Sequence, residues 1–298
     1  MKKYKIICPL INFHISWNML TGSHTAEESR RLFGERKERV VKGINLVNGV
    51  KIRHISKEDL EDLKTFPFTL PPDMRELISP RMFVLEKRIV VKNDHAFHLH
   101  EVIRDIILAL RLLKEGIIFG SFVFYILLSK KRQLTSWAHE DDRPRVDLRK
   151  YILNFEEMPR LRRMIKKIKG IDFSKRKSLD LACRRFQRAY EEKDAEDRLI
   201  DLMIAFEALF LKGEKGVPSK GKVIAVACSI LLGKNEEERQ EIKRTLSEAY
   251  STRNSIVHGS EYPRIESDSK GEVYVDTLPD LVSKVEDYLR ESIKKLLD

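Results

Sequence analysis

The stretch LIDLMIAFEALFL, residues 199–211, decides the fold of the second half of the chain. Its apolar side chains recur at helical spacing and cover nearly every side of the helix that they predict. A helix that is apolar almost all round is buried in the centre of its domain. Asp194, which precedes this stretch, is a residue type that caps helix N-termini. The stretch therefore predicts a central helix with other helices packed around it.

The segments on either side carry the same helical spacing. One helix is expected over residues 179–190, where apolar side chains fall on one face. Pro218 suits the first turn of the helix after the central one, Gly233 its end, and Asn235 the N-cap of the next. A last helix is expected from about Pro279. Five helices with mostly short connections predict a helical bundle.

The first half of the chain mixes strands and helices. β-Forming residues predict strands over residues 3–13 and 81–92, and helices are expected after the N-cap Ser56 and over residues 101–114. The apolar run over residues 117–128 is shorter than the ~20 residues of a membrane span, so it predicts a buried strand. The expected fold class is therefore α+β.

The predicted organisation is an N-terminal mixed α/β domain of unknown role over residues 1–150 and a C-terminal all-α bundle over residues 175–298. A basic segment over residues 151–174 joins them. Residues 130–177 hold 16 basic and 7 acidic side chains, and so most of the net charge of +11. Such a run is either a solvated helix face or a surface that binds RNA phosphates. The candidate RNA-binding residues are Arg160, Arg162, Arg163, Lys166, Lys167 and Lys169. A membrane-surface or DNA-binding role is a third interpretation.

Composition excludes several classes of protein. Of the 298 residues, 42% are hydrophobic, which is enough to build cores and excludes wholesale disorder. Three scattered cysteines argue against a disulfide framework or a zinc knuckle and favour the reducing cytoplasm. Neither a secretory signal peptide nor a membrane span is expected, so we predict a cytoplasmic protein without membrane contact. Gly-rich phosphate loops and the motifs GxSxG and HExxH are absent from the sequence. We therefore do not expect an ATPase, a serine hydrolase or a zinc protease.

The residues with candidate chemistry end the fourth helix of the bundle, in the sequence SEAYSTRNSIVHG over residues 247–259. Arg253 follows Tyr250 by three positions and leans toward the buried stripe, so it should be paired or face a cleft. Asn254 and His258 are four residues apart, so the amide can reach the imidazole. Gly259 is the expected helix terminator, which places His258 at a helix C-terminus.

Two interpretations of this pattern remain open from spacing alone. One is an Arg–carboxylate pair beside a histidine that caps the helix. The other is a catalytic site, but Arg253 and His258 are five residues apart and lie about 140° apart around an ideal helix. To act on one group, they need a distorted helix end or a second subunit.

The second half of the chain resembles a HEPN domain (higher eukaryotes and prokaryotes nucleotide-binding), and most of all the Apea-like HEPN group. That group carries an Arg, a polar residue and a His at the spacing of Arg253, Asn254 and His258. The stretch AFEALFL with Glu207 and the final helix YLRESIKKLL also match. The resemblance covers about residues 175–298, with a looser match over residues 108–116.

This resemblance implies a metal-independent endoribonuclease, a toxin or antiviral effector, that acts as a homodimer with two motifs facing one cleft. It implies that His258 is the acid or base, that Arg253 binds the phosphate, and that Asn254 orients the imidazole or bonds a phosphate oxygen. Glu207 is expected near Arg253, either as its buried partner or as a group that positions it, and Tyr250 supports the site. No cofactor is implied, while RNA and an antitoxin or other regulatory partner are.

The family also contains inactive members, so a non-catalytic module that binds RNA or a protein is the alternative. Some family toxins are modified on a Tyr two residues after the motif His, but position 260 is Ser here, so that regulation is not expected. His95, His98 and His100 could ligate a metal if His98 and His100 share a strand face. Isolated histidines more often cap or pack, so no metal site is predicted.

Overall fold

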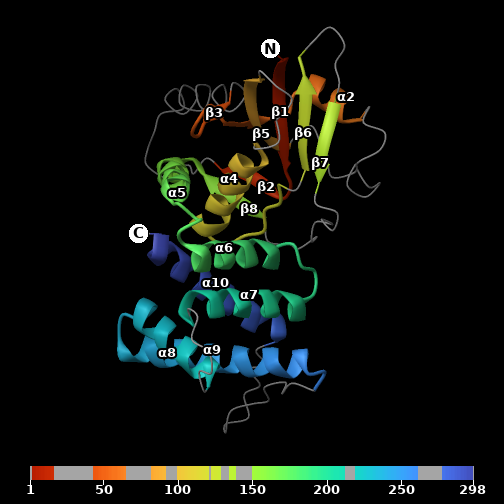
Figure 1. Ribbon diagram of the computed structural model, residues 1–298. Helices are drawn as coiled ribbons and strands as arrows, with labels where there is room; N and C mark the ends of the chain where they lie inside the picture. Colours follow the sequence, from red (N-terminus) through yellow and green to blue (C-terminus); the bar gives the residue numbers. More distant parts are fainter. Residues whose placement is uncertain are drawn as a thin grey trace, which may run out of the picture. The chain divides into compact units, whose positions relative to one another are not determined.

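The computed structural model describes residues 2–16, 43–64, 82–91, 99–120, 122–128, 134–138, 150–211, 219–260 and 277–297. The chain divides into two compact units, Met1–Lys169 and Gly170–Asp298 (Figure 1). The first unit contains both strands and helices, whereas the described residues of the second unit form helices alone. The predicted α+β class is therefore confirmed.

A six-stranded sheet organises the first unit. Its strand order is β3-β4-β5-β1-β6-β7, and every pairing is antiparallel. The central strand β1 is buried on both faces, since Ile6, Ile7 and Cys8 are at most 1% exposed. The apolar run that could have been mistaken for a membrane segment contains β6, as predicted. The strands are β1 (Lys2–Leu10), β3 (Ile44–Asn45), β4 (Lys51–His54), β5 (Phe83–Val91), β6 (Phe122–Leu127) and β7 (Leu134–Ala138).

Helices and a second, two-stranded sheet complete this unit. Strand β2 (Phe13–Ser16) pairs in parallel with β8 (Tyr151–Asn154). Helix α2 (Lys57–Lys64) begins with the predicted capping residue: the Asp59 amide donates to Ser56 Oγ at 3.1 Å, and the Ser56 amide donates to the Asp59 carboxylate at 3.0 Å. Helix α4 (Leu99–Leu113) covers the predicted helix, and among the described residues no helix is long and apolar enough to cross a membrane.

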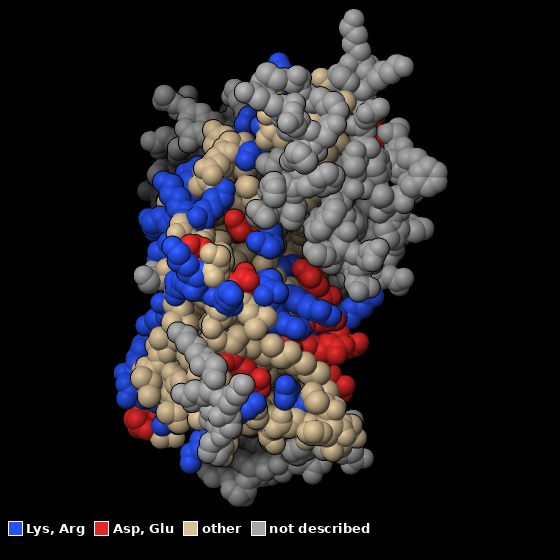
Figure 2. All heavy atoms as spheres, in the orientation of Figure 1, with Lys and Arg blue, Asp and Glu red and all other residues tan. Residues whose placement is uncertain are grey.

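Most of the basic segment, residues 151–169, belongs to the first unit. After β8 and a short 3₁₀ turn (Phe155–Glu157), helix α5 (Met158–Gly170) runs to the division of the chain between Lys169 and Gly170. Its side chains Leu161, Ile165 and Ile168 are buried, at the helical spacing seen in the sequence. Figure 2 shows Lys and Arg gathered over the part of the surface where α5 lies in Figure 1.

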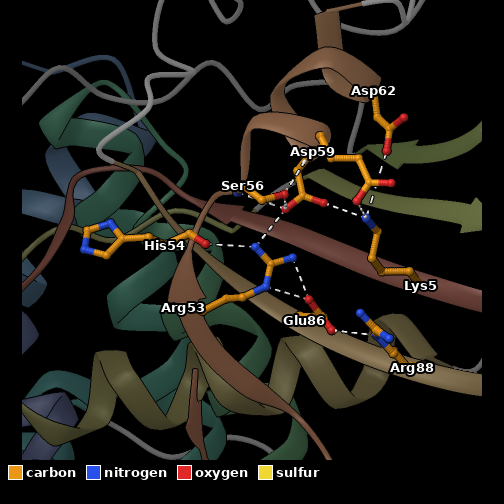
Figure 3. Close-up of polar contacts among 9 residues, drawn as sticks. Lys5, Arg53, His54, Ser56, Asp59, Asp62, Glu86 and Arg88 are labelled. Carbon is orange, nitrogen blue, oxygen red and sulfur yellow. Dashed lines mark hydrogen bonds and ion pairs between the residues drawn. The ribbon is translucent and has the colours of Figure 1, made fainter. Parts of the chain in front are cut away.

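A buried charged network ties α2 to three strands of the sheet (Figure 3). Asp59 is fully buried, and its carboxylate lies 2.7 Å from both Lys5 Nζ on β1 and Arg53 Nη1 on β4. Arg53 also pairs with Glu86 on β5, at 2.5 Å. Burial alone would raise the pKa of Asp59, but hydrogen bonds from Arg53, Lys5 and Ser56 outweigh burial and hold the pKa well below its ordinary value.

The second unit contains five helices among its described residues, at the positions that the sequence predicts. Helix α7 contacts all four others and buries most of its surface, so it is the central helix. The side chain of Asn235 accepts a hydrogen bond from the Glu238 amide at 2.8 Å and so caps α9 as expected. Pro218 lies outside the described residues. The helices are α6 (Lys177–Ala189), α7 (Ala195–Phe210), α8 (Lys220–Leu232), α9 (Glu236–Val257) and α10 (Leu278–Leu297).

Candidate functional site

The motif residues lie at the C-terminal end of α9. The helix ends at His258, and Gly259 adopts a φ of +66°, a left-handed conformation that favours glycine. The Gly259 amide donates to the Ile256 carbonyl at 3.1 Å, and the Ser260 amide donates to the Ser255 carbonyl at 2.8 Å. These two bonds are the Schellman pattern of a helix end. The prediction that Gly259 terminates the helix is therefore confirmed, and His258 is exposed at the helix C-terminus.

Arg253 turns toward α7. Its Nη2 lies 3.9 Å from Glu207 Oε1, so the expected proximity of these two residues is observed. Its Nη1 donates to the Asn254 side-chain oxygen at 3.1 Å, and its guanidinium carbon lies 5.9 Å from the centre of the Tyr250 ring. Nε is buried and has no hydrogen-bond partner in the described part of the chain. The Arg253 side chain is 20% exposed, so an anion can still reach the guanidinium from solvent.

Tyr250 links three helices around this arginine. Its hydroxyl hydrogen-bonds Glu207, and burial, followed by the negative charge of Glu207, raises the pKa of Tyr250 above its ordinary value. The hydroxyl therefore stays protonated at neutral pH and donates to the carboxylate. The ring also lies against the start of α8: a Cβ atom added at Gly221 would lie 2.7 Å from Tyr250 ring atoms. Only glycine fits this approach without displacement.

The spacing predicted that the side chain of Asn254 can reach the His258 imidazole. In the structure, its oxygen accepts a hydrogen bond from Arg253 instead. In the described residues, Asn254 and His258 are linked by the helical bond from the His258 amide to the Asn254 carbonyl, at 3.0 Å. Arg253 faces Glu207, while His258 is exposed at the helix end. One chain thus brings together Glu207, Tyr250, Arg253 and Asn254. The imidazole of His258 lies beside this group and is exposed.

A shallow pocket of about 470 Å³ borders the same residues. Two cations line it, Lys220 and Lys222, and none of its lining residues is acidic. It shares Tyr250 and Asn254 with the motif, so an anion in the pocket would lie beside them. Residue spacing alone did not predict this neighbourhood, since the lysines precede the motif by about thirty residues and no local pattern joins them. The lining residues are Ser219, Lys220, Gly221, Lys222, Ser247, Tyr250, Ser251 and Asn254.

The predicted RNA-binding residues all lie on α5, in the first unit, but they are not equivalent. Arg162 is half-buried, and its Nε and Nη2 donate to the Asn45 carbonyl on β3 at 3.0 and 2.7 Å. Arg162 therefore anchors α5 to the strand, a role that the sequence pattern did not distinguish from binding. Lys169 is also half-buried. The exposed members are Arg160, Arg163, Lys166 and Lys167.

Of the three histidines of the first half, the structure describes His100. It belongs to helix α4, so the predicted strand face shared with His98 is wrong. His95 and His98 lie outside the described residues. Within the described ranges, no group of three or more His, Cys, Asp or Glu side chains could hold a metal ion. The three cysteines are buried thiols.

No protein-family model matches this chain, and neither a curated protein nor a solved structure matches it at a significant level. The resemblance of residues 175–298 to HEPN domains therefore depends on the motif at the end of α9, on Glu207 in the central helix and on the order of the helices.

Proposed function

We propose that the protein is a metal-independent endoribonuclease of the HEPN type, a toxin or antiviral effector in the cytoplasm, held in check by an antitoxin or other regulatory partner. The observation that carries the proposal is the guanidinium of Arg253, held by Glu207 and Asn254 just over one helical turn before the exposed His258. The arrangement offers a fixed cation for a phosphate and a titratable group beside it.

These residue types suit RNA cleavage by the 2′-hydroxyl. A base takes the proton of that hydroxyl while the 2′-oxygen bonds to phosphorus, and an acid protonates the 5′-oxygen as its bond to phosphorus breaks. Histidine suits both roles because its pKa lies near neutrality, and each role typically contributes ~10²–10⁴ in rate. The crowded phosphorus intermediate carries extra negative charge, which a forked guanidinium stabilises more than it stabilises the substrate.

A second copy of the chain would complete the site. One His258 cannot be base and acid at once for a single cleavage, whereas two copies supply both roles from one position. Val257, which precedes His258, is 52% exposed. We propose that the homodimer contact includes this side chain at the end of α9, next to the motif.

A non-catalytic RNA- or protein-binding module is the second candidate, favoured by one specific observation. Within one chain Arg253 has a carboxylate partner, and His258 faces solvent without touching it. A binding module needs no more than this arrangement. The nuclease, in contrast, needs the second His258 to approach the Arg253 of its partner.

The test is cleavage of a labelled RNA pool in EDTA by the wild type, His258→Ala and Arg253→Ala. Arg244→Ala, which removes an exposed arginine from the same helix, is the matched control. Thermal melting checks that each variant folds. We expect cleavage by the wild type and the control, and its loss in the other two. Wild-type protein that leaves RNA intact but binds it with a steep salt dependence would favour the binding module.

A further inference from the structure

The outward face of α5 is a dense array of cations. Residues 160–169 (RLRRMIKKIK) hold six basic side chains, and α5 contains no acidic one. The exposed members Arg160, Arg163, Lys166 and Lys167 lie opposite the buried apolar side chains at the 3.6-residue period of the helix. Arg160, Arg163 and Lys166 have no hydrogen bond or ion pair within the described residues. Their charges therefore face solvent without a neutralising partner there.

The positive surface continues from α5 onto the sheet. Lys87 on β5 lies close enough to Lys169 that, after burial, the charge of Lys169 is the second cause that lowers the pKa of Lys87. Two cations brought together in this way repel, and an anion beside them removes the penalty. The bonds from Arg162 to the Asn45 carbonyl hold this flank of α5 in place. We call Arg160, Arg163, Lys166, Lys167, Lys169 and Lys87 the α5 surface.

We propose that the α5 surface binds the backbone phosphates of single-stranded RNA without regard to base sequence. Clustered Lys and Arg gain affinity for a polyanion by releasing its counterions. Contacts to phosphates carry no base-sequence information, and the exposed charged side chains of α5 are all cations. The choice of RNA over DNA rests on the proposed nuclease function.

A lipid surface fits the α5 surface less well. Helices that lie on membranes insert an apolar face among the lipids. The apolar face of α5 is already buried, with Leu161 and Ile165 at 0% exposure, so α5 has no apolar face to insert. Attraction to a bilayer would be purely electrostatic.

The experiment measures binding of a labelled single-stranded RNA of mixed sequence to full-length protein carrying His258→Ala, so that cleavage does not interfere. The variant Arg160→Gln/Arg163→Gln/Lys166→Gln removes three charges from the α5 surface. The matched control Lys3→Gln/Lys57→Gln/Lys193→Gln removes three exposed charges elsewhere. Affinity is measured over a series of salt concentrations, and thermal melting verifies folding.

We expect the α5 variant to lose at least about tenfold in affinity and its log–log salt slope to fall by ~2, since each phosphate contact with a single strand contributes ~0.7. The control should stay within about twofold of its parent, and RNAs of different sequence should bind alike. Equal losses in both variants, an unchanged salt slope, or tighter binding to duplex DNA or anionic vesicles would overturn the proposal. Because no cleavage is measured, these outcomes are independent of whether the protein is a nuclease.

Discussion

Glu207 of α7 and Arg253 of α9 are 46 positions apart in the sequence, yet their carboxylate and guanidinium lie 3.9 Å apart. The same carboxylate accepts the hydroxyl hydrogen of Tyr250. Glu207 therefore restrains the one cation of the motif and the aromatic ring beside it. In the proposed nuclease, Glu207 is a positioning residue that acts through Arg253.

Glu207→Gln should lower the rate of RNA cleavage by about tenfold or more, since it removes the charge that orients Arg253. The loss should appear mainly in kcat, with Glu207→Asp restoring part of it. Both side chains are at least 20% exposed, so the ion pair should contribute less than about 1 kcal/mol to stability. Cleavage kinetics beside urea unfolding would check this. A fall in stability that accounts for the whole loss of activity would assign Glu207 a merely structural role.

Gly221→Ala should destabilise the second unit by about 1–3 kcal/mol, because the new methyl group would lie 2.7 Å from the Tyr250 ring. Within a helix, alanine normally stabilises relative to glycine by up to about 1 kcal/mol, so the expected sign is the reverse of the usual one. Gly170→Ala at the end of α5 is the control, since nothing lies within 4 Å of its Cβ position. Urea unfolding of both variants measures the difference. A Gly221→Ala protein as stable as the wild type would contradict the close packing of α8 on Tyr250.

Asp59→Asn should destabilise the first unit by about 3–5 kcal/mol, because Lys5 and Arg53 would remain buried with less opposing charge. Glu58→Gln is the matched control: its side chain is 63% exposed, and its loss should cost no more than about 0.5 kcal/mol. Urea unfolding at neutral pH compares the two. Equal costs at both positions would show that the buried network does not hold α2 to the sheet.

The stability of the first unit should also fall in acid. The pKa values of Asp59 and Glu86 are both lowered in the folded protein, where Arg53 opposes the effect of burial. Their contribution is complete above the ordinary carboxyl pKa of about 4 and is lost as the pH falls through the lower folded values. Unfolding measured over a pH series should show this acid loss in the wild type and a shallower one in Asp59→Asn. If the wild type and Asp59→Asn lost stability equally in acid, Asp59 would not be a source of this loss.

The second unit should lose stability in alkali. Burial, and then the charge of Glu286, raises the pKa of Tyr190, whose oxygen accepts a hydrogen bond from Arg290 Nη2 at 2.8 Å. Above the ordinary tyrosine pKa of about 10, the unfolded chain releases this proton while the folded chain keeps it. The free energy of unfolding should then fall by about 1.4 kcal/mol per pH unit until the folded pKa is reached. In Tyr190→Phe the free energy of unfolding should fall less steeply with pH above about 10. An unaltered slope in this variant would exclude Tyr190 as the cause of the alkaline loss.

Much of the fold follows from local sequence rules. The caps Ser56 and Asn235, the terminator Gly259 and the central helix α7 lie where spacing and residue type predict them. Caps, helical stripes and strand runs depend on neighbours within a few positions, so a single sequence contains the information. His100 shows the limit of these rules, because its two-residue spacing from His98 suggested a shared strand face where a helix begins.

The sequence by itself determined the helices, the strands β1, β5 and β6, and the identity of the motif at the end of α9, whereas β3, β4, β7 and β8 were not predicted. Only the tertiary structure decided which partner each polar group takes. Asn254 accepts from Arg253 and not from His258, Arg162 bonds a strand carbonyl, and the lysines of α8 border the motif's pocket. The buried network around Asp59 likewise joins four separate segments. These pairings depend on which distant segments the packing of the core brings within about 4 Å, and no pattern along the chain encodes that distance.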